Sequence, residues 1–261
     1  MGPSILFCPA DRPDRYAKAL ERADTVIIDL EDAVGEDRKA AARQALVDTS
    51  LDPQRVIVRI NGYDTNHIAA DLRAVAQTKY TRIMLPKCET AEQAQKLAPY
   101  RVTALCETAA GIINVAQIAA VENVDALMWG AEDLIASLGG TSSRVNGQYR
   151  DVARFARAQV LLQSVVHRKQ VIDSVYLDIP DLDGLRIEAE DAAASGFSAK
   201  AAIHPSQCPV IRSAFAPTEA QIDYARRVLA AAEKNPGVFS FEGQMVDEPV
   251  LRQARAILAR I

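Results

Sequence analysis

Short apolar runs alternate with Ala-rich amphipathic stretches along almost the whole chain. Each run has the length and the bounding residues of a buried strand, and each stretch between runs has apolar residues at helical spacing. The strand-type runs occupy residues 4–9, 25–30, 56–60, 82–86, 102–106, 126–129, 171–179 and 199–203. Helical spacing and good helix formers occur in residues 38–47, 68–77, 91–97 and 187–194. This alternation predicts repeated βα units built on a parallel sheet.

Eight such runs indicate an α/β fold of the closed (β/α)₈ or TIM barrel type. The alternative is an open doubly wound sheet, which usually has fewer strands and a glycine-rich first turn that this chain lacks. A length of 261 residues suits one barrel. We expect the barrel in residues 1–215 and a C-terminal helical extension in residues 216–261, where two more helical patterns (219–234 and 249–261) exceed what a barrel needs.

The composition excludes several classes of partner. The formal net charge is −4 and the pI about 5.5, so no nucleic acid or acidic membrane surface is expected as a partner. No run reaches transmembrane length, and the N-terminus lacks the pattern of a signal peptide. The four cysteines are scattered without paired spacing, which favours neither zinc nor disulfides and indicates a cytoplasmic protein.

Two clusters of acidic residues lie about one βα repeat apart. Glu107 follows the run 102–106, and Asp133 follows the next run. The carboxyl ends of parallel strands form the ligand-binding edge of a barrel, so both acids should face one pocket. Two carboxylates at a pocket mouth suit Mg²⁺, which leaves its other positions to water and substrate oxygens. The alternative is that each acid caps the helix that follows it.

Arg59 differs from the other polar residues because it lies inside an apolar run. A charge is costly on a strand that is covered on both faces, so the side chain should point into the barrel mouth. A guanidinium there can bind a carboxylate through two hydrogen bonds or stabilise a developing enolate. The alternative is a buried ion pair with Glu31 or Asp32.

Two further features are ambiguous from sequence. Residues 137–149 are rich in Gly, Ser and Asn and form a long loop after the sixth strand, either a lid over the site or a surface excursion. His204 precedes a turn-forming proline, which favours a structural histidine over a catalytic base.

Several short motifs together resemble the citrate lyase β-subunit-like proteins. This family belongs to the wider HpcH/HpaI aldolase group, which includes malyl-CoA and citramalyl-CoA lyases and is related to malate synthase. The resemblance spans nearly the whole chain. It rests on residues 6–15 (LFCPADRPDR), 28–34 (IDLEDAV), 58–61 (VRIN), 85–87 (LPK), Glu107 and Thr108 with Gly111, 130–134 (GAEDL), 196–207 (GFSAKAAIHPSQ) and 243–249 (GQMVDEP).

The resemblance implies a site at the carboxyl edge of the barrel. Glu107 and Asp133 would hold Mg²⁺, and Arg59 would bind the oxygens of an oxo acid and of an enolate. Glu31 and Asp32 match acids that order the surroundings of this site.

Other parts of the chain acquire roles by the same resemblance. Backbone N–H groups of Gly130, Ala131 and Glu132 would bind the substrate carboxylate. Asp247 resembles an acid/base that reaches into the site of a neighbouring subunit, which would make the extension a lid in a trimer or a dimer of trimers. The chain departs from the family pattern at residues 9–11 and 198–200, near the expected entrance for coenzyme A, so the preference for an acyl carrier stays open.

The activity implied is a Mg²⁺-dependent carbon–carbon lyase. It would cleave a short 3-hydroxyacyl-CoA thioester of the malyl-, citramalyl- or 3-hydroxy-3-methylglutaryl-CoA type to an oxo acid and an acyl-CoA, through an enolate. One alternative is the β-subunit of a citrate lyase complex, which cleaves citryl-acyl-carrier-protein to oxaloacetate. A further alternative is a non-catalytic subunit that binds an oxo acid and coenzyme A.

Overall fold

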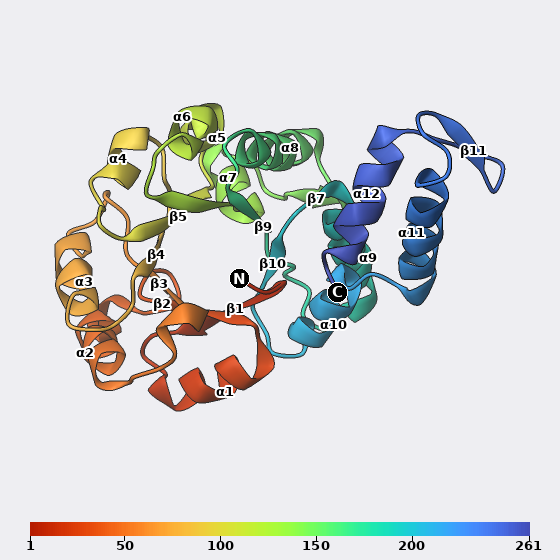
Figure 1. The fold of residues 1–261 in the computed structure, drawn as a ribbon. Helices are drawn as coiled ribbons and strands as arrows, with labels where there is room; N and C mark the ends of the chain where they lie inside the picture. Colours follow the sequence, from red (N-terminus) through yellow and green to blue (C-terminus); the bar gives the residue numbers. More distant parts are fainter. The chain divides into compact units, whose positions relative to one another are not determined.

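A computed structural model describes residues 1–261, in which eight parallel strands close into a barrel (Figure 1). The barrel strands are β1 (Ser4–Pro9), β2 (Thr25–Asp29), β3 (Val56–Arg59), β4 (Arg82–Leu85), β5 (Arg101–Cys106), β6 (Val124–Trp129), β9 (Gln170–Asp173) and β10 (Ala199–Ala202). The first strand pairs in parallel with both β2 and β10, so the sheet has no free edge. The predicted (β/α)₈ barrel is confirmed and the open sheet is excluded.

Helices surround this barrel on its outside (Figure 1). They are α1 (Tyr16–Arg22), α2 (Lys39–Asp48), α3 (Ile68–Val75), α4 (Ala91–Gln95), α5 (Ala109–Ile113), α6 (Val115–Ala119), α7 (Ala131–Ser137), α8 (Asp151–Val166), α9 (Leu182–Ser195) and α10 (Gln207–Phe215), with 3₁₀ turns at Pro13–Arg15, Glu36–Arg38 and Pro53–Arg55. Side-chain caps begin three of these helices: a capping box between Thr90 and Gln93 at α4, Thr108 at α5 and Asp181 at α9. No helix is long and apolar enough to cross a lipid bilayer.

The barrel interior changes from apolar to polar towards the carboxyl ends of the strands. Away from the carboxyl edge the interior is filled by one buried apolar cluster, made up of Ile5, Ile27, Ile57, Met84, Leu105, Ala126, Met128, Ile172, Ala199 and Ala201. Side chains two residues apart on a strand share a face, so the next inward positions lie at the carboxyl edge. These positions are occupied by Phe7, Asp29, Arg59, Glu107, Gly130, Ser174 and Ile203.

The seventh barrel strand is shorter than predicted. The apolar run 171–179 suggested a strand of nine residues, but β9 ends at Asp173. Hydrogen bonding to the neighbouring strands ends there: β9 pairs with β6 up to its residue Ile172 and with β10 up to its residue Asp173. Beyond that point Leu177 and Ile179 are exposed, so their apolar character does not reflect strand pairing.

The long loop after the sixth barrel strand contains a small antiparallel hairpin of β7 (Arg144–Val145) and β8 (Gln148–Tyr149). Its turn is Asn146-Gly147, and both residues have positive φ (51° and 76°), as a two-residue hairpin turn requires. The loop is therefore ordered by its own turn chemistry and ladder.

The chain divides into two compact units, Met1–Arg212 and Ser213–Ile261. The second unit contains α11 (Glu219–Ala232), α12 (Glu248–Leu258) and a hairpin of β11 (Phe239–Phe241) and β12 (Gln244–Val246). Both predicted helices are present, whereas the hairpin between them was not predicted. The two helices pack through a small core of Ala225, Val228, Val246, Leu251 and Ala254.

Candidate active site

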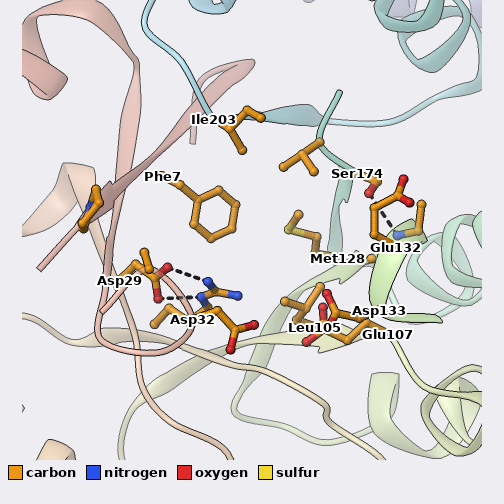
Figure 2. A pocket seen from close by; sticks show the side chains of 16 residues that line it. Phe7, Asp29, Asp32, Leu105, Glu107, Met128, Glu132, Asp133, Ser174 and Ile203 are labelled. Atoms are coloured by element: carbon orange, nitrogen blue, oxygen red, sulfur yellow. Dashed lines mark hydrogen bonds and ion pairs between the residues drawn. The ribbon is translucent and has the colours of Figure 1, made fainter. Parts of the chain in front are cut away.

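A cavity of about 310 Å³ opens at the carboxyl ends of the barrel strands (Figure 2). Figure 2 shows the apolar side chains of Phe7, Met128 and Ile203 together with acidic side chains around the cavity. Five carboxylates and one guanidinium line the cavity: Asp29, Asp32, Glu107, Glu132, Asp133 and Arg59. The excess of negative charge suits a cation, and the volume suits a small ligand.

Arg59 ends β3 and is 9% exposed on the cavity wall. Its Nε and Nη2 donate to the two carboxylate oxygens of Asp29 at 2.7 and 2.5 Å, and its Nη1 lies 2.8 Å from Glu31 Oε2. Burial alone would lower the pKa of this guanidinium, but Asp29 and Glu31 hold the pKa above its usual value. Arg59 is therefore both a cavity residue and a member of a buried ion pair, and its main partner, Asp29, was missed from the sequence.

Glu31 and Asp32 occupy different places around Arg59. Glu31 is buried and binds Lys87 Nζ at 2.6 Å as well as Arg59. Burial raises the pKa of Glu31 above its usual value despite these two cations. Asp32 lines the cavity, and Lys87 Nζ lies 3.8 Å from its carboxylate. Glu31 thus supports Arg59, while Asp32 stands at the cavity rim.

Glu107 follows β5 and is only 3% exposed. Its Oε1 accepts the backbone N–H of Lys87 at 3.0 Å. Burial first, and then the charge of Asp133, raise the pKa of Glu107 to about 8. Thr108, and not Glu107, caps helix α5, so the capping alternative for Glu107 is wrong.

Asp133 lies in the first turn of α7, lines the same cavity, and makes no hydrogen bond or ion pair. Glu107 and Asp133 thus repel each other with few compensating partners, which a divalent cation would relieve. No group of three or more His, Cys, Asp or Glu side chains in the chain could hold a metal. Mg²⁺ is commonly bound by one or two protein carboxylates, and water and ligand oxygens fill its other coordination positions. Glu107 and Asp133 therefore fit this ion.

The turn that begins α7 is packed tightly over Glu107. A Cβ atom on Gly130 would lie 2.6 Å from Glu107 Oε2, so glycine is required for this close approach. The Ala131 N–H donates to the Ser174 hydroxyl at 3.2 Å, and the Glu132 carboxylate accepts from Ser143 and Arg144. Gly130, Ala131 and Glu132 line the cavity, as expected for a turn that binds substrate. The Ala131 N–H, however, is already hydrogen-bonded to Ser174.

Asp247 belongs to the second unit, where its side chain accepts the backbone N–H of Val250 and caps α12. His204 Nδ1 lies 2.8 Å from the Ser206 hydroxyl, a local contact. Ser174 was missed, although its place two residues after the inward-facing Ile172 could have identified it.

A second cavity, of about 760 Å³, shares Phe7, Pro9 and Ile203 with the first. Its lining includes the cationic residues Arg15, Lys18 and Arg22. The two cavities are therefore neighbours with opposite charge, the first acidic and the second predominantly basic.

A closed barrel that gathers carboxylates and a buried arginine at the carboxyl ends of its strands has the arrangement of a barrel enzyme, whose active sites lie at this edge. Residues 3–205 match the family HpcH/HpaI aldolase/citrate lyase, and the chain belongs to this family. It is therefore an enzyme of the aldolase and lyase class, as its motifs indicate.

The chain is similar over nearly its full length to proteins of this family. It is 55% identical to a citrate lyase subunit beta-like protein of Mycobacterium tuberculosis (strain ATCC 25618 / H37Rv), covering 99% of this chain and 95% of that protein. It is 34% identical to a (3S)-malyl-CoA thioesterase of Cereibacter sphaeroides (strain ATCC 17029 / ATH 2.4.9), with coverage of 98% and 93%. Against the mitochondrial citramalyl-CoA lyase of Rattus norvegicus the identity is 31%, with coverage of 98% and 84%.

A solved structure has nearly the same fold. The crystal structure of protein CitE from Mycobacterium tuberculosis in complex with magnesium, acetoacetate and coenzyme A superposes with a TM-score of 0.97. It is 55% identical and covers 99% of this chain and 97% of that chain. That relative therefore binds magnesium, an oxo acid and coenzyme A.

Proposed function

We propose that this protein is a Mg²⁺-dependent carbon–carbon lyase that cleaves a short 3-hydroxyacyl-CoA thioester to an oxo acid and an acyl-CoA. The observation that carries the proposal is the single cavity lined by the buried Arg59, the buried Glu107 and Asp133. An enolate of a weakly acidic thioester must be stabilised during such a cleavage, and positive charge at its oxygens is the main means of doing so.

Glu107 and Asp133 would hold the Mg²⁺. Bound there, the ion supplies Lewis acidity towards substrate oxygens. Arg59 has N–H groups left after its contacts with Asp29 and Glu31, and these would donate to the oxo-acid oxygens and to the enolate. Because Asp29 and Glu31 fix the guanidinium, its orientation is set before substrate arrives.

The cleavage needs two proton transfers. A base removes the proton of the substrate hydroxyl, the C–C bond breaks, and its electron pair becomes the enolate of the acyl thioester. The enolate carbon then takes up a proton. We assign this second transfer to Asp247 of a neighbouring subunit, in a homo-oligomer that is a trimer or a dimer of trimers and works in the cytoplasm.

The second cavity supports a coenzyme A thioester over a free acid. Arg15, Lys18 and Arg22 give it positive charge that suits the phosphate groups of coenzyme A. Because it shares Phe7, Pro9 and Ile203 with the acidic cavity, an acyl chain could reach the metal site from there.

A substrate panel tests the proposal. Malyl-CoA, citramalyl-CoA, 3-hydroxy-3-methylglutaryl-CoA and a citryl thioester are incubated with and without Mg²⁺, with Asp133→Ala as the control. Metal-dependent release of an oxo acid and an acyl-CoA, lost in the control, supports the lyase and selects its substrate.

The products also discriminate the alternatives. The similarity to a (3S)-malyl-CoA thioesterase makes hydrolysis a second candidate, which would release free coenzyme A and an intact hydroxy acid. Turnover of only a carrier-bound citryl group would favour the citrate lyase β-subunit. Binding of an oxo acid without any cleavage would favour a non-catalytic subunit.

A further inference from the structure

The cavity contains a third carboxylate near the pair proposed to bind the metal. Glu132 precedes Asp133 in the first turn of α7, and both line the cavity. Its side chain remains 36% exposed, so packing alone does not fix it. Glu132 nevertheless forms no three-carboxylate cluster with Glu107 and Asp133.

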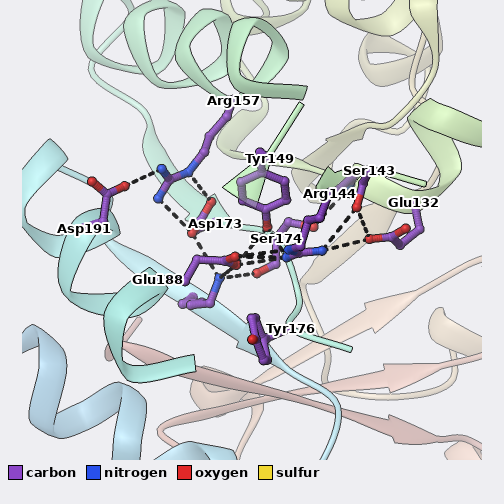
Figure 3. Close-up of polar contacts among 12 residues, drawn as sticks. Glu132, Ser143, Arg144, Tyr149, Arg157, Asp173, Ser174, Tyr176, Glu188 and Asp191 are labelled. Atoms are coloured by element: carbon purple, nitrogen blue, oxygen red, sulfur yellow. Dashed lines mark hydrogen bonds and ion pairs between the residues drawn. The ribbon is translucent and has the colours of Figure 1, made fainter. Parts of the chain in front are cut away.

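Two residues of the loop after α7 hold Glu132 (Figure 3). The Ser143 hydroxyl donates to Glu132 Oε1 at 2.7 Å, and Arg144 Nη1 donates to the same oxygen at 3.0 Å. Ser143 is 2% exposed and Arg144 begins the β7–β8 hairpin. The ordered hairpin therefore presents two donors to one carboxylate oxygen.

The Arg144 side chain is held in place by further contacts with Glu188 and Tyr149. Its Nη2 donates to Glu188 Oε2 at 3.0 Å and to the Tyr149 hydroxyl at 2.5 Å, and its guanidinium lies 4.1 Å from the centroid of the Tyr149 ring. Glu188 in turn accepts from the fully buried Lys200 at 2.8 Å, and Lys200 also donates to Asp173 at 3.0 Å. Because these partners belong to α9, β10 and β9, the barrel wall anchors the contact to Glu132.

We propose that Ser143 and Arg144 are positioning residues that hold Glu132 away from the cation site. The ion then keeps two protein carboxylates, and its other positions stay open to water and to substrate oxygens. A third carboxylate would bind the ion more tightly and would occupy a position that the substrate needs, because cation affinity rises with the number of charged ligands. The inference rests on the metal site of the proposed function.

The test uses Mn²⁺ as a spectroscopic probe in the full-length protein without substrate. Its dissociation constant is measured by electron paramagnetic resonance, and the waters bound to the ion are counted by proton relaxation. Wild-type protein is compared with Ser143→Ala, Arg144→Ala and the double variant Arg144→Ala/Glu132→Gln. Arg150→Ala is the matched control, since Arg150 donates to the Ser142 carbonyl in the same loop without touching Glu132.

We expect Arg144→Ala to lower the dissociation constant for Mn²⁺ roughly three- to tenfold and to displace bound water. Ser143→Ala should act in the same direction without changing the protein's charge, which separates ligation by Glu132 from the loss of a nearby cation. The double variant should return both quantities to wild-type values, and Arg150→Ala should leave both unchanged. KM for the thioester should rise in Arg144→Ala and in Ser143→Ala.

Two results would overturn the inference in different ways. Unchanged or weaker Mn²⁺ binding with an unchanged water count in both single variants would show that Glu132 does not compete for the ion, while the metal site stands. Failure of wild-type protein to bind Mn²⁺, with Asp133→Ala behaving identically, would overturn the metal site itself and this inference with it. If Arg144→Ala does not fold, Ser143→Ala decides alone.

Discussion

Asp29 binds the guanidinium of Arg59 at two points, 2.7 Å from Nε and 2.5 Å from Nη2. The two residues are registered partners on adjacent strands, β2 and β3, and both side chains point inward. Such a two-point contact sets the plane of the guanidinium as well as its position. The cavity therefore receives a cation whose orientation is determined by the strand register.

Asp29→Ala should destabilise the protein and impair turnover. Removing one partner of a buried ion pair leaves a charge with less compensation, which costs about 3 kcal/mol of unfolding free energy. Because Arg59 would lose its orientation, kcat should fall more than KM rises. Urea unfolding and steady-state kinetics measure the two effects.

The control for this prediction is Asp223→Ala, which breaks an exposed pair with Arg227 one helical turn away. An exposed pair of this kind contributes less than about 1 kcal/mol. Equal losses of stability in both variants would contradict the buried role of Asp29.

Gly130→Ala should weaken metal binding with the fold retained. The added Cβ would lie 2.6 Å from Glu107 Oε2 and 2.8 Å from Glu107 Cβ, so the carboxylate must move. We expect the Mg²⁺ concentration for half-maximal activity to rise by about tenfold, which corresponds to about 1.4 kcal/mol of lost binding. Gly35→Ala is the matched control, since its Cβ would meet only one Asp37 oxygen at 3.1 Å. A Gly130→Ala enzyme with wild-type metal dependence would show that Glu107 is not a ligand.

The sequence predicts much of the fold and the residues that follow each strand. Strand runs and helical spacing define a barrel, and the barrel brings Arg59, Glu107 and Asp133 to one edge whatever the details of packing. The predicted end of the seventh barrel strand, β9, was wrong. A strand extends only as far as its neighbours pair with it, and an apolar run carries no information about the length of those neighbours.

Side-chain contacts between residues on distant elements could not be predicted from the sequence. Strand alternation could have indicated Asp29 and Ser174, because each lies two positions after an inward apolar residue. Nothing local in the sequence pairs Arg144 with Glu188, since the contact depends on where the hairpin lies against α9. The extension also illustrates this limit: its helices were predicted, but its hairpin was not.

Acid should destabilise the protein through Asp173. Burial alone would raise the pKa of this carboxyl, but Lys200 and Arg157 hold the pKa below its usual value. A carboxyl with a lowered native pKa contributes stability that is fully present above its unfolded pKa of about 3.9 and is lost as the pH falls through the native pKa. The free energy of unfolding should therefore decline below about pH 4. Asp173→Asn should be less stable at pH 7, because it removes one of the two carboxylates that pair with the buried Lys200 and leaves Glu188 alone in that role. The variant should also show a shallower decline in acid, and an unchanged slope would exclude Asp173 as the cause.

Mixed oligomers test whether Asp247 serves the site of a neighbouring subunit. Asp133→Ala and Asp247→Ala should each be inactive as homo-oligomers. If each site combines Asp133 of one chain with Asp247 of another, equal mixing followed by subunit exchange should restore about a quarter of wild-type activity, because both intact residues must meet at random. If Asp247 instead serves its own chain's site, no mixture can combine both residues in one site, and activity stays absent. Mixing without subunit exchange is the matched control, and size-exclusion chromatography with light scattering establishes the number of chains over which the residues are shared.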